Sequence, residues 1–164
     1  SLFNILAHAP WAQQVAGLLT SGDALVLDAF AGSGALGFEA LSRGAERAWF
    51  WDRSAACITT IRDNARHLNA GDRVIAQRID ATKPPTAPRP VDLVFLDPPY
   101  EQGFIPTTLD ALTRHGWVRD LTLVVAETKR REQLVLNTDW ISLDRRDIGD
   151  TGLSFLRPSM AGAA

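Results

Sequence analysis

The stretch DAFAGSGALG, residues 28–37, decides the fold of this chain. It follows a short apolar run at residues 24–27 and leads into a helical pattern that ends near Arg43. A buried strand, a glycine-rich turn and a helix, in this order, are typical of the first unit of a doubly wound α/β sheet. Gly32 and Gly34 have no Cβ, so the backbone can approach a ligand closely at this turn.

Strand and helix patterns alternate on both sides of this stretch. A helix is expected over residues 1–20, with Pro10 either breaking it or starting a second helix. The expected later strands are 47–51, 74–79, 91–96 and 121–126, the expected later helices are 54–68 and 105–114, and residues 140–148 and 153–157 form an expected antiparallel pair. The sequence therefore predicts an α/β Rossmann-like fold, a mostly parallel seven-stranded sheet with helices on both faces and a C-terminal antiparallel strand pair.

Composition places the chain among ordinary globular proteins. It has 164 residues, 46% of them hydrophobic and 22% charged, which fits a single domain covering residues 1–164. No apolar run is long enough to cross a bilayer, so no membrane is expected as a partner. One cysteine allows no internal disulfide, in keeping with a reducing, cytoplasmic location. The net charge of -2 argues mildly against nucleic-acid binding, which usually requires a basic face.

Four aspartates each follow a predicted strand. These are Asp28, Asp52, Asp80 and Asp97. The carboxyl ends of parallel strands meet at one edge of a sheet, and ligands bind there in open α/β folds. One such acid could be a helix cap, but four in succession predict a shared ligand crevice.

The glycine-rich turn formally matches GxGxxG, the dinucleotide-binding pattern. In dinucleotide folds the strand usually runs straight into the first glycine, whereas here Asp28 ends the strand and Phe30 intervenes. A carboxylate at this point would repel a pyrophosphate and suits a ligand that carries an ammonium group. The pattern therefore favours a cationic ligand over NAD.

Two of the other acids suit a nucleoside. Asp52 can accept both hydroxyls of a ribose, although it could instead cap the following helix. Asp80 could accept from the amino group of an adenine, although it could be an acid in a solvated loop.

The segment Asp97-Pro98-Pro99-Tyr100 is the most specific motif of the chain. Two prolines fix the backbone directly after a buried strand and remove two N–H donors, so the local backbone offers only carbonyl acceptors. An amine that donates to Asp97 and to the Pro98 carbonyl would be held in one orientation. Tyr100 offers a flat ring on which a base can stack.

The motifs DAFAGSGALGFEALSRGA (residues 28–45) and VFLDPPY (residues 94–100), with Phe3-Asn4 and Asn64 around them, resemble the RsmD-type 16S rRNA guanine-N2 methyltransferases. The resemblance covers residues 2 to about 157. DPPY alone is less specific, because DNA adenine methyltransferases share it. The stretch AGSGALGFEALSRGA, together with the LFN segment before it, indicates the rRNA branch.

The resemblance implies a Rossmann-like S-adenosylmethionine-dependent methyltransferase fold with no metal. It assigns the target guanine to Asp97, Pro98, Pro99 and Tyr100, and the cofactor to Asp28, Phe30, Ala31, Gly32, Ser33, Gly34, Asp52, Arg53, Asp80 and Ala81. Within that set Asp52 takes the ribose, and Asp80 and Ala81 border the adenine. Glu127 stands where the family often has an acid, and it receives no role.

The implied substrate is rRNA in an assembling small ribosomal subunit, acted on by a monomer. Two features depart from the family pattern: Asp52 stands where glutamate is common, and the usual basic β-hairpin before the LFN segment is absent, with the positive charge that it would supply. Two alternatives stay open. One is a DNA adenine or cytosine amino-methyltransferase that uses the same DPPY loop, and the other is a non-catalytic nucleotide-binding module.

Overall fold

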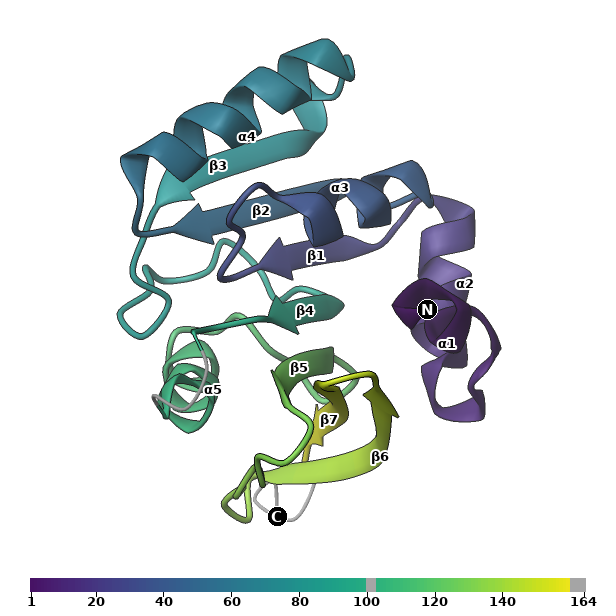
Figure 1. Cartoon of the computed structure of the whole chain (residues 1–164). Helices are drawn as coiled ribbons and strands as arrows, with labels where there is room; N and C mark the ends of the chain where they lie inside the picture. Colours follow the sequence, from purple (N-terminus) through teal and green to yellow (C-terminus); the bar gives the residue numbers. More distant parts are fainter. Residues whose placement is uncertain (100–102, 160–164) are drawn as a thin grey trace.

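The computed structural model describes residues 1–99 and 103–159, which form one seven-stranded sheet with helices on both faces (Figure 1). The strands are β1 (Leu25–Asp28), β2 (Arg47–Asp52), β3 (Val74–Arg78), β4 (Leu93–Leu96), β5 (Leu123–Lys129), β6 (Trp140–Ile148) and β7 (Thr151–Pro158). The helices are α1 (Leu2–His8), α2 (Gln13–Ser21), α3 (Ala35–Ser42), α4 (Ala55–His67) and α5 (Phe104–Arg114), with short 3-10 turns at Pro10–Ala12 and Gly71–Arg73.

The strand order is β3-β2-β1-β4-β5-β7-β6. Strands β1 to β5 run parallel, whereas β7 is antiparallel to both β5 and β6. The chain moves outward from β1 to β3 and then returns to the other side of β1 as β4. This reversal opens a crevice between the carboxyl ends of β1 and β4, the point at which such sheets bind ligands. The predicted sheet and its terminal antiparallel pair are confirmed.

The two faces of the sheet are covered differently. One core combines side chains of α1 to α4 with alternate sheet residues such as Val26, Phe50 and Phe95. The opposite core uses α5 and the irregular segments around Val91 and Trp117. The central strands are therefore buried on both faces and read as continuous apolar runs.

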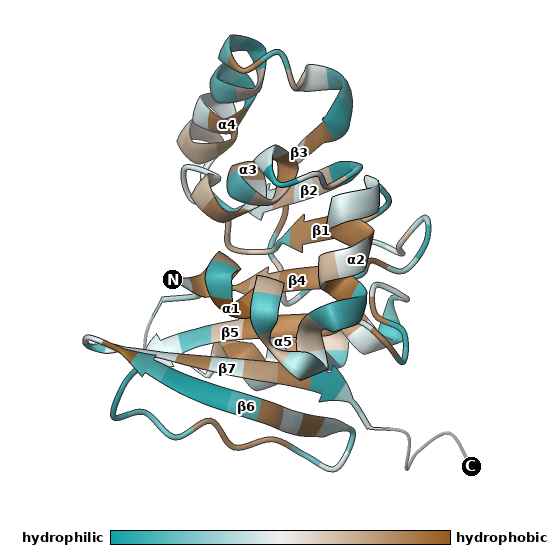
Figure 2. Ribbon diagram, turned by 90° about the vertical axis from the view of Figure 1, so that its right-hand side faces the viewer, coloured by the Kyte–Doolittle hydropathy of each residue, from teal (hydrophilic) through white to brown (hydrophobic). Residues whose placement is uncertain are grey.

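Hydropathy follows this arrangement (Figure 2). The inner strands β1 and β4 are mostly hydrophobic, whereas the edge strand β6 is largely hydrophilic. Residues 144–147 of β6 are Asp-Arg-Arg-Asp, and the structure pairs Arg146 with Asp144 and Arg145 with Asp147. Charged side chains on an exposed edge discourage pairing with another sheet.

Several predicted boundaries need correction. Strand β5 continues past Glu127 to Lys129, because residues 127–129 pair with residues 151–153 of β7. Strand β3 ends at Arg78, so Asp80 lies two residues beyond the strand instead of directly after it. The predicted break of the N-terminal helix at Pro10 is confirmed, because Pro10 begins a 3-10 turn between α1 and α2.

The turn before α3 depends on glycine at two positions. Gly34 has a φ of 87°, a left-handed conformation that side chains disfavour. A Cβ at Gly37 would lie 2.2 Å from Cε1 of Phe50, so only glycine lets α3 pack this closely on β2. The N-terminal end of α3 is thereby set directly beside the carboxyl end of β1.

No helix in the described part of the chain is long and apolar enough to span a membrane.

Candidate active site

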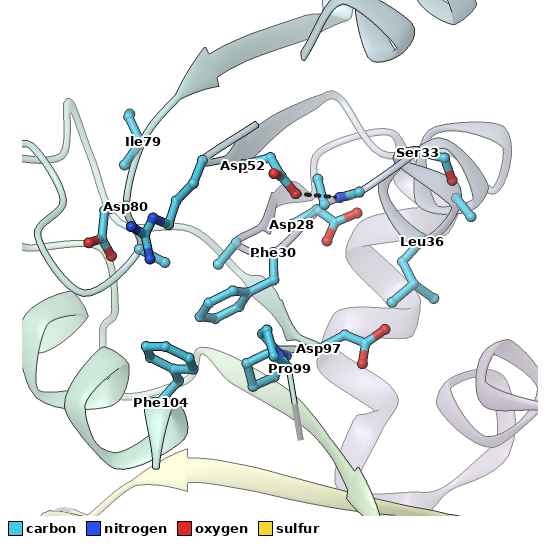
Figure 3. Close-up of a pocket in the computed structure, with 17 residues that line it drawn as sticks. Asp28, Phe30, Ser33, Leu36, Asp52, Ile79, Asp80, Asp97, Pro99 and Phe104 are labelled. Carbon is cyan, nitrogen blue, oxygen red and sulfur yellow. Dashed lines mark hydrogen bonds between the residues drawn. The ribbon is translucent and has the colours of Figure 1, made fainter. Parts of the chain in front are cut away.

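A cleft of about 680 Å³ opens at the carboxyl ends of β1, β2 and β4 (Figure 3). Asp28, Asp52 and Asp97 come from three different strand ends and surround the same space. The lining residues are Asp28, Ala29, Phe30, Ala31, Gly32, Ser33, Ala35, Leu36, Asp52, Arg53, Ile79, Asp80, Ala81, Asp97, Pro98, Pro99 and Phe104. The fold thus brings distant parts of the sequence to one place.

Nearly all of the residues assigned from sequence line this cleft. Gly34 does not; it is the residue before α3, and its N–H donates to the Ala31 carbonyl at 2.7 Å. Tyr100 lies outside the described residues. The assigned residues therefore share one site, while the role of each stays a prediction.

Asp28 is the most deeply buried acid of the cleft, with 1% of its surface exposed. Its Oδ2 accepts the Gly37 N–H at 3.1 Å. Burial nevertheless raises the pKa of Asp28 to about 7, with smaller contributions from the negative charges of Asp97 and Asp52. An ionised Asp28 is therefore costly by itself, and a cation bound nearby would stabilise it.

Asp52 joins β2 to the glycine-rich turn. Its Oδ2 accepts the Gly32 N–H at 2.9 Å, the bond drawn in Figure 3, and its Oδ1 accepts the Ser54 N–H at 2.9 Å. Ser54 caps α4, because its side chain accepts from the Cys57 N–H. Asp52 is thus not the helix cap, and each of its carboxylate oxygens keeps a second lone pair for a ligand hydroxyl.

Asp80 is held by the next turn of chain. Its Oδ1 accepts from both the backbone N–H and the hydroxyl of Thr82. These bonds, with the nearby positive charges of Arg53 and Lys83, keep the pKa of Asp80 below its usual range. Asp80 is therefore an ionised acceptor at the edge of the cleft, next to the buried Ala81.

Asp97 forms a hydrogen-bonded pair of carboxyl groups with Glu127. Leu96 of β4 is in register with Ala126 of β5, so the next residues on these two parallel strands are Asp97 and Glu127. Partial desolvation raises the pKa of both acids although Asp97 keeps an exposed side in the cleft, and the charge of Asp97 and then its hydrogen bond bring the pKa of Glu127 to about 7. Two neighbouring carboxyl groups disfavour each other's ionisation, which contributes to the raised pKa of Glu127.

The apolar side of the cleft was not predicted from sequence. Phe104, the first residue of α5, lines the cleft with Leu36 and Ile79. The rings of Phe30 and Phe104 lie 6.2 Å apart at a tilt of 45° (Figure 3). The available signal was an aromatic residue directly after Gly103, where the helical pattern begins.

The donors and acceptors of the cleft fit a cationic nucleoside. It offers carboxylates for an ammonium or sulfonium group and for hydroxyls, a glycine turn without side chains, and aromatic walls for a flat ring. In the described ranges no group of three or more His, Cys, Asp or Glu residues is placed to hold a metal ion. S-Adenosylmethionine has the charge and the groups that these side chains would hold.

Relatives with assigned functions match this chain. It is 30% identical to Ribosomal RNA small subunit methyltransferase D of Buchnera aphidicola over 115 residues, 70% of this chain and 60% of that protein. It is 32% identical to the Haemophilus influenzae protein of the same name over 127 residues, 75% of this chain and 66% of that protein. The chain thus spans less than two thirds of the length of these relatives.

Solved structures agree with the fold. A candidate methylase of Haemophilus influenzae is 26% identical, with a TM-score of 0.75 over 91% of this chain and 99% of that one. An RNA methyltransferase of Salinibacter ruber, solved with S-adenosyl-L-homocysteine, shares the fold at 16% identity and a TM-score of 0.65, over 93% of each chain. The model of the family described as conserved hypothetical protein 95 matches residues 1–157. The chain therefore belongs to this family, the RsmD-type methyltransferases.

Proposed function

We propose that this chain binds S-adenosylmethionine and methylates the exocyclic N2 amine of a guanine in small-subunit rRNA. The observation that carries the proposal is that Asp97 and Pro98 line the same cleft as Asp28, Gly32 and Asp52. The residues proposed to accept hydrogen bonds from the target amine are therefore adjacent to the residues proposed to bind the nucleoside. An NAD-binding module or a non-catalytic nucleotide module would have no use for the Asp-Pro-Pro segment beside its ligand.

In this proposal, different residues of the cleft bind different parts of the cofactor. Asp28 and the turn at residues 30–34 hold the methionine part, and Asp52, flanked by Arg53, accepts the ribose hydroxyls. Asp80 and Ala81 border the adenine. When bound, S-adenosylmethionine supplies a methyl group on a sulfonium that needs no further activation for transfer to an amine.

The acceptor half orients the amine. Asp97 and the Pro98 carbonyl accept its two N–H groups, which aims the nitrogen lone pair into the cleft and stabilises the positive charge that develops on it. Asp97 then receives the proton that the amine loses. Pro99 fixes this segment, and Tyr100 is the proposed stacking surface for the base. The base must leave its stack to enter, as in other base-modifying enzymes.

The names of the relatives, which specify small-subunit rRNA methylation, support rRNA as the substrate. We propose rRNA within an assembling small subunit in the cytoplasm, acted on by one copy of the chain as a single domain. A DNA amino-methyltransferase remains the second candidate, because the Asp-Pro-Pro-Tyr segment would serve its chemistry equally. The product nucleoside separates the two.

Cofactor binding provides the first test. Isothermal titration is expected to show binding of S-adenosylmethionine and S-adenosylhomocysteine but not of NAD. Asp52→Ala is expected to weaken both interactions by at least about 10-fold, because it removes a ribose acceptor and releases the Gly32 N–H that Asp52 holds. Asp63→Ala, on the outward part of α4, is the matched control and keeps wild-type affinity. NAD binding by the wild-type chain would contradict the proposal.

The substrate test uses methyl-labelled cofactor. Unmodified 16S rRNA, small ribosomal subunits and duplex DNA are incubated with the chain, and the products are digested and identified by mass spectrometry. N2-methylguanosine from rRNA or from subunits supports the proposal. Methylated adenine or cytosine from DNA, with no modified guanine in RNA, favours the DNA enzyme.

The aromatic wall gives a further prediction. Phe104→Ala is expected to weaken S-adenosylmethionine binding about 10-fold, because it removes a ring that faces the cleft beside Phe30. Phe38→Ala removes a ring that packs on Phe50 in the opposite core, so it is expected to lower the melting temperature without a comparable loss of affinity. Equal effects of the two variants on affinity would show that Phe104 acts only through stability.

A further inference from the structure

The neighbour of Asp97 has no role in the mechanism above. Glu127 of β5 lies beside Asp97, the residue directly after β4, and the two carboxyl groups are hydrogen-bonded to each other. Thr151 of β7 also hydrogen-bonds Glu127, which lowers the pKa of Glu127. The structure thus places a second carboxyl group, held by two partners, next to the proposed amine acceptor.

A second cavity adjoins the cleft at this point. It has a volume of about 190 Å³, and Glu127 is among the residues that line it. Pro98, Pro99 and Phe104 line both this cavity and the cleft. Glu132 also lines the cavity, and its Oε1 is buried without a hydrogen-bond partner among the described residues. The cavity therefore presents acceptors to a group that supplies N–H donors.

Guanine carries such donors side by side. Its N1–H and N2–H groups lie on one edge of the ring, whereas adenine has a lone pair at N1. We propose that Glu127 selects guanine by accepting the N1–H while Asp97 accepts from the N2 amine, with the base entering beside Pro98 and Pro99. The inference rests on the proposed function and adds its specificity-determining residue.

The charge of the two carboxyl groups explains how this contact discriminates between guanine and a base with a lone pair at N1. Without a ligand, burial and the mutual repulsion of the two carboxyl groups favour a proton on the pair; when guanine enters, this proton leaves to solvent and two N–H donors take its place. At a pH above the raised pKa of Glu127, a base with a lone pair at N1 would face an ionised Glu127 without a donor. An unpaired, desolvated carboxylate is much more costly than a missing hydrogen bond between neutral groups, so rejection is expected to be strong.

The test uses 2-aminopurine, which keeps the N2 amine but has a lone pair at N1. The target nucleotide is first mapped in the RNA or subunit that the wild-type chain methylates, and that substrate is then rebuilt with guanine or 2-aminopurine at this position. At pH 8, where Glu127 is mostly ionised, the wild-type chain is expected to prefer guanine by about 10-fold or more in kcat/KM. Glu127→Gln can donate to the N1 lone pair, so its preference is expected to fall to about 2-fold or less.

The ratio of kcat/KM for guanine to kcat/KM for 2-aminopurine distinguishes direct recognition of the base by Glu127 from a role in positioning Asp97. If Glu127 only positioned Asp97, Glu127→Gln would slow both substrates equally and leave the ratio unchanged, which would overturn the inference. So would a ratio that falls in Glu132→Gln and not in Glu127→Gln. Glu46→Gln, an exposed glutamate paired with Arg89, is the control for the same chemical change. No guanine methylation by the wild-type chain would overturn the proposed function itself and this inference with it.

Discussion

Replacing Asp97 with alanine is expected to lower kcat for methyl transfer by about 10²–10³-fold, with little change in the Kd of S-adenosylmethionine. Asp97 lines the cleft and directly precedes Pro98 and Pro99, which line both the cleft and the second cavity. The variant loses the acceptor that orients the amine and the group that takes its proton, whereas the nucleoside-binding acids are untouched. Single-turnover rates with mapped RNA, together with cofactor titration, measure the two quantities separately.

A second substitution separates the two proposed roles of Asp97, which are to accept a hydrogen bond from the amine and to take its proton. Asp97→Asn keeps an acceptor oxygen but cannot hold a proton at neutral pH, so its rate is expected to lie between those of Asp97→Ala and the wild type. Asp72→Ala, an exposed aspartate in the turn before β3, is the matched control and should retain the wild-type rate. Wild-type turnover in Asp97→Ala would refute the assignment of the amine to this carboxylate.

The position of the site could be predicted from the sequence, because it follows from topology. Parallel strands place their carboxyl ends at one edge, so the acids after successive apolar runs had to converge. Asp28, Asp52 and Asp97 needed no more than this rule. Asp80 lines the same cleft although its strand ends earlier than predicted, because the intervening residue Ile79 carries the chain along the same edge.

The contacts that these acids make with neighbouring residues could not be predicted, because they depend on the register between strands and on the fold of the turns. Whether Glu127 meets Asp97 depends on Leu96 pairing with Ala126, and a slip of one residue would turn one side chain to the other face. The bond from the Gly32 N–H to Asp52 depends likewise on how the glycine turn folds back over β2. Phe104 was missed because an aromatic residue at a helix start is more often part of the core.

Replacing Asp28 with asparagine is expected to stabilise the cofactor-free protein at pH 8 by as much as about 4 kcal/mol and to leave its stability at pH 4 nearly unchanged. In the folded protein the pKa of Asp28 rises from its ordinary value of 3.8 to about 7, mainly because the side chain is buried. Between these two values the folded protein binds one more proton than the unfolded chain. Its stability therefore falls as the pH rises through this window and becomes constant above it.

Urea unfolding at pH 4, 6 and 8 measures this difference. Asparagine cannot ionise, and its side-chain oxygen can still accept the Gly37 N–H. The Asp97–Glu127 pair contributes a pH dependence of the same sign, because burial raises both of its pKa values, but it is present in both proteins. The comparison of wild type with Asp28→Asn therefore isolates Asp28, and equal pH slopes in the two proteins would contradict its raised pKa.

The same substitution is expected to reverse its effect when the cofactor is added. In the wild-type protein at pH 8, the ionised and poorly solvated Asp28 gains a cationic partner from the methionine part of S-adenosylmethionine, so binding should raise the melting temperature strongly. The asparagine variant gains no such charge compensation and should bind more weakly, with a smaller rise. A residue that destabilises the empty fold and stabilises the complex is expected of a binding group and not of a structural one. An equal rise in both proteins would place the ammonium group away from Asp28.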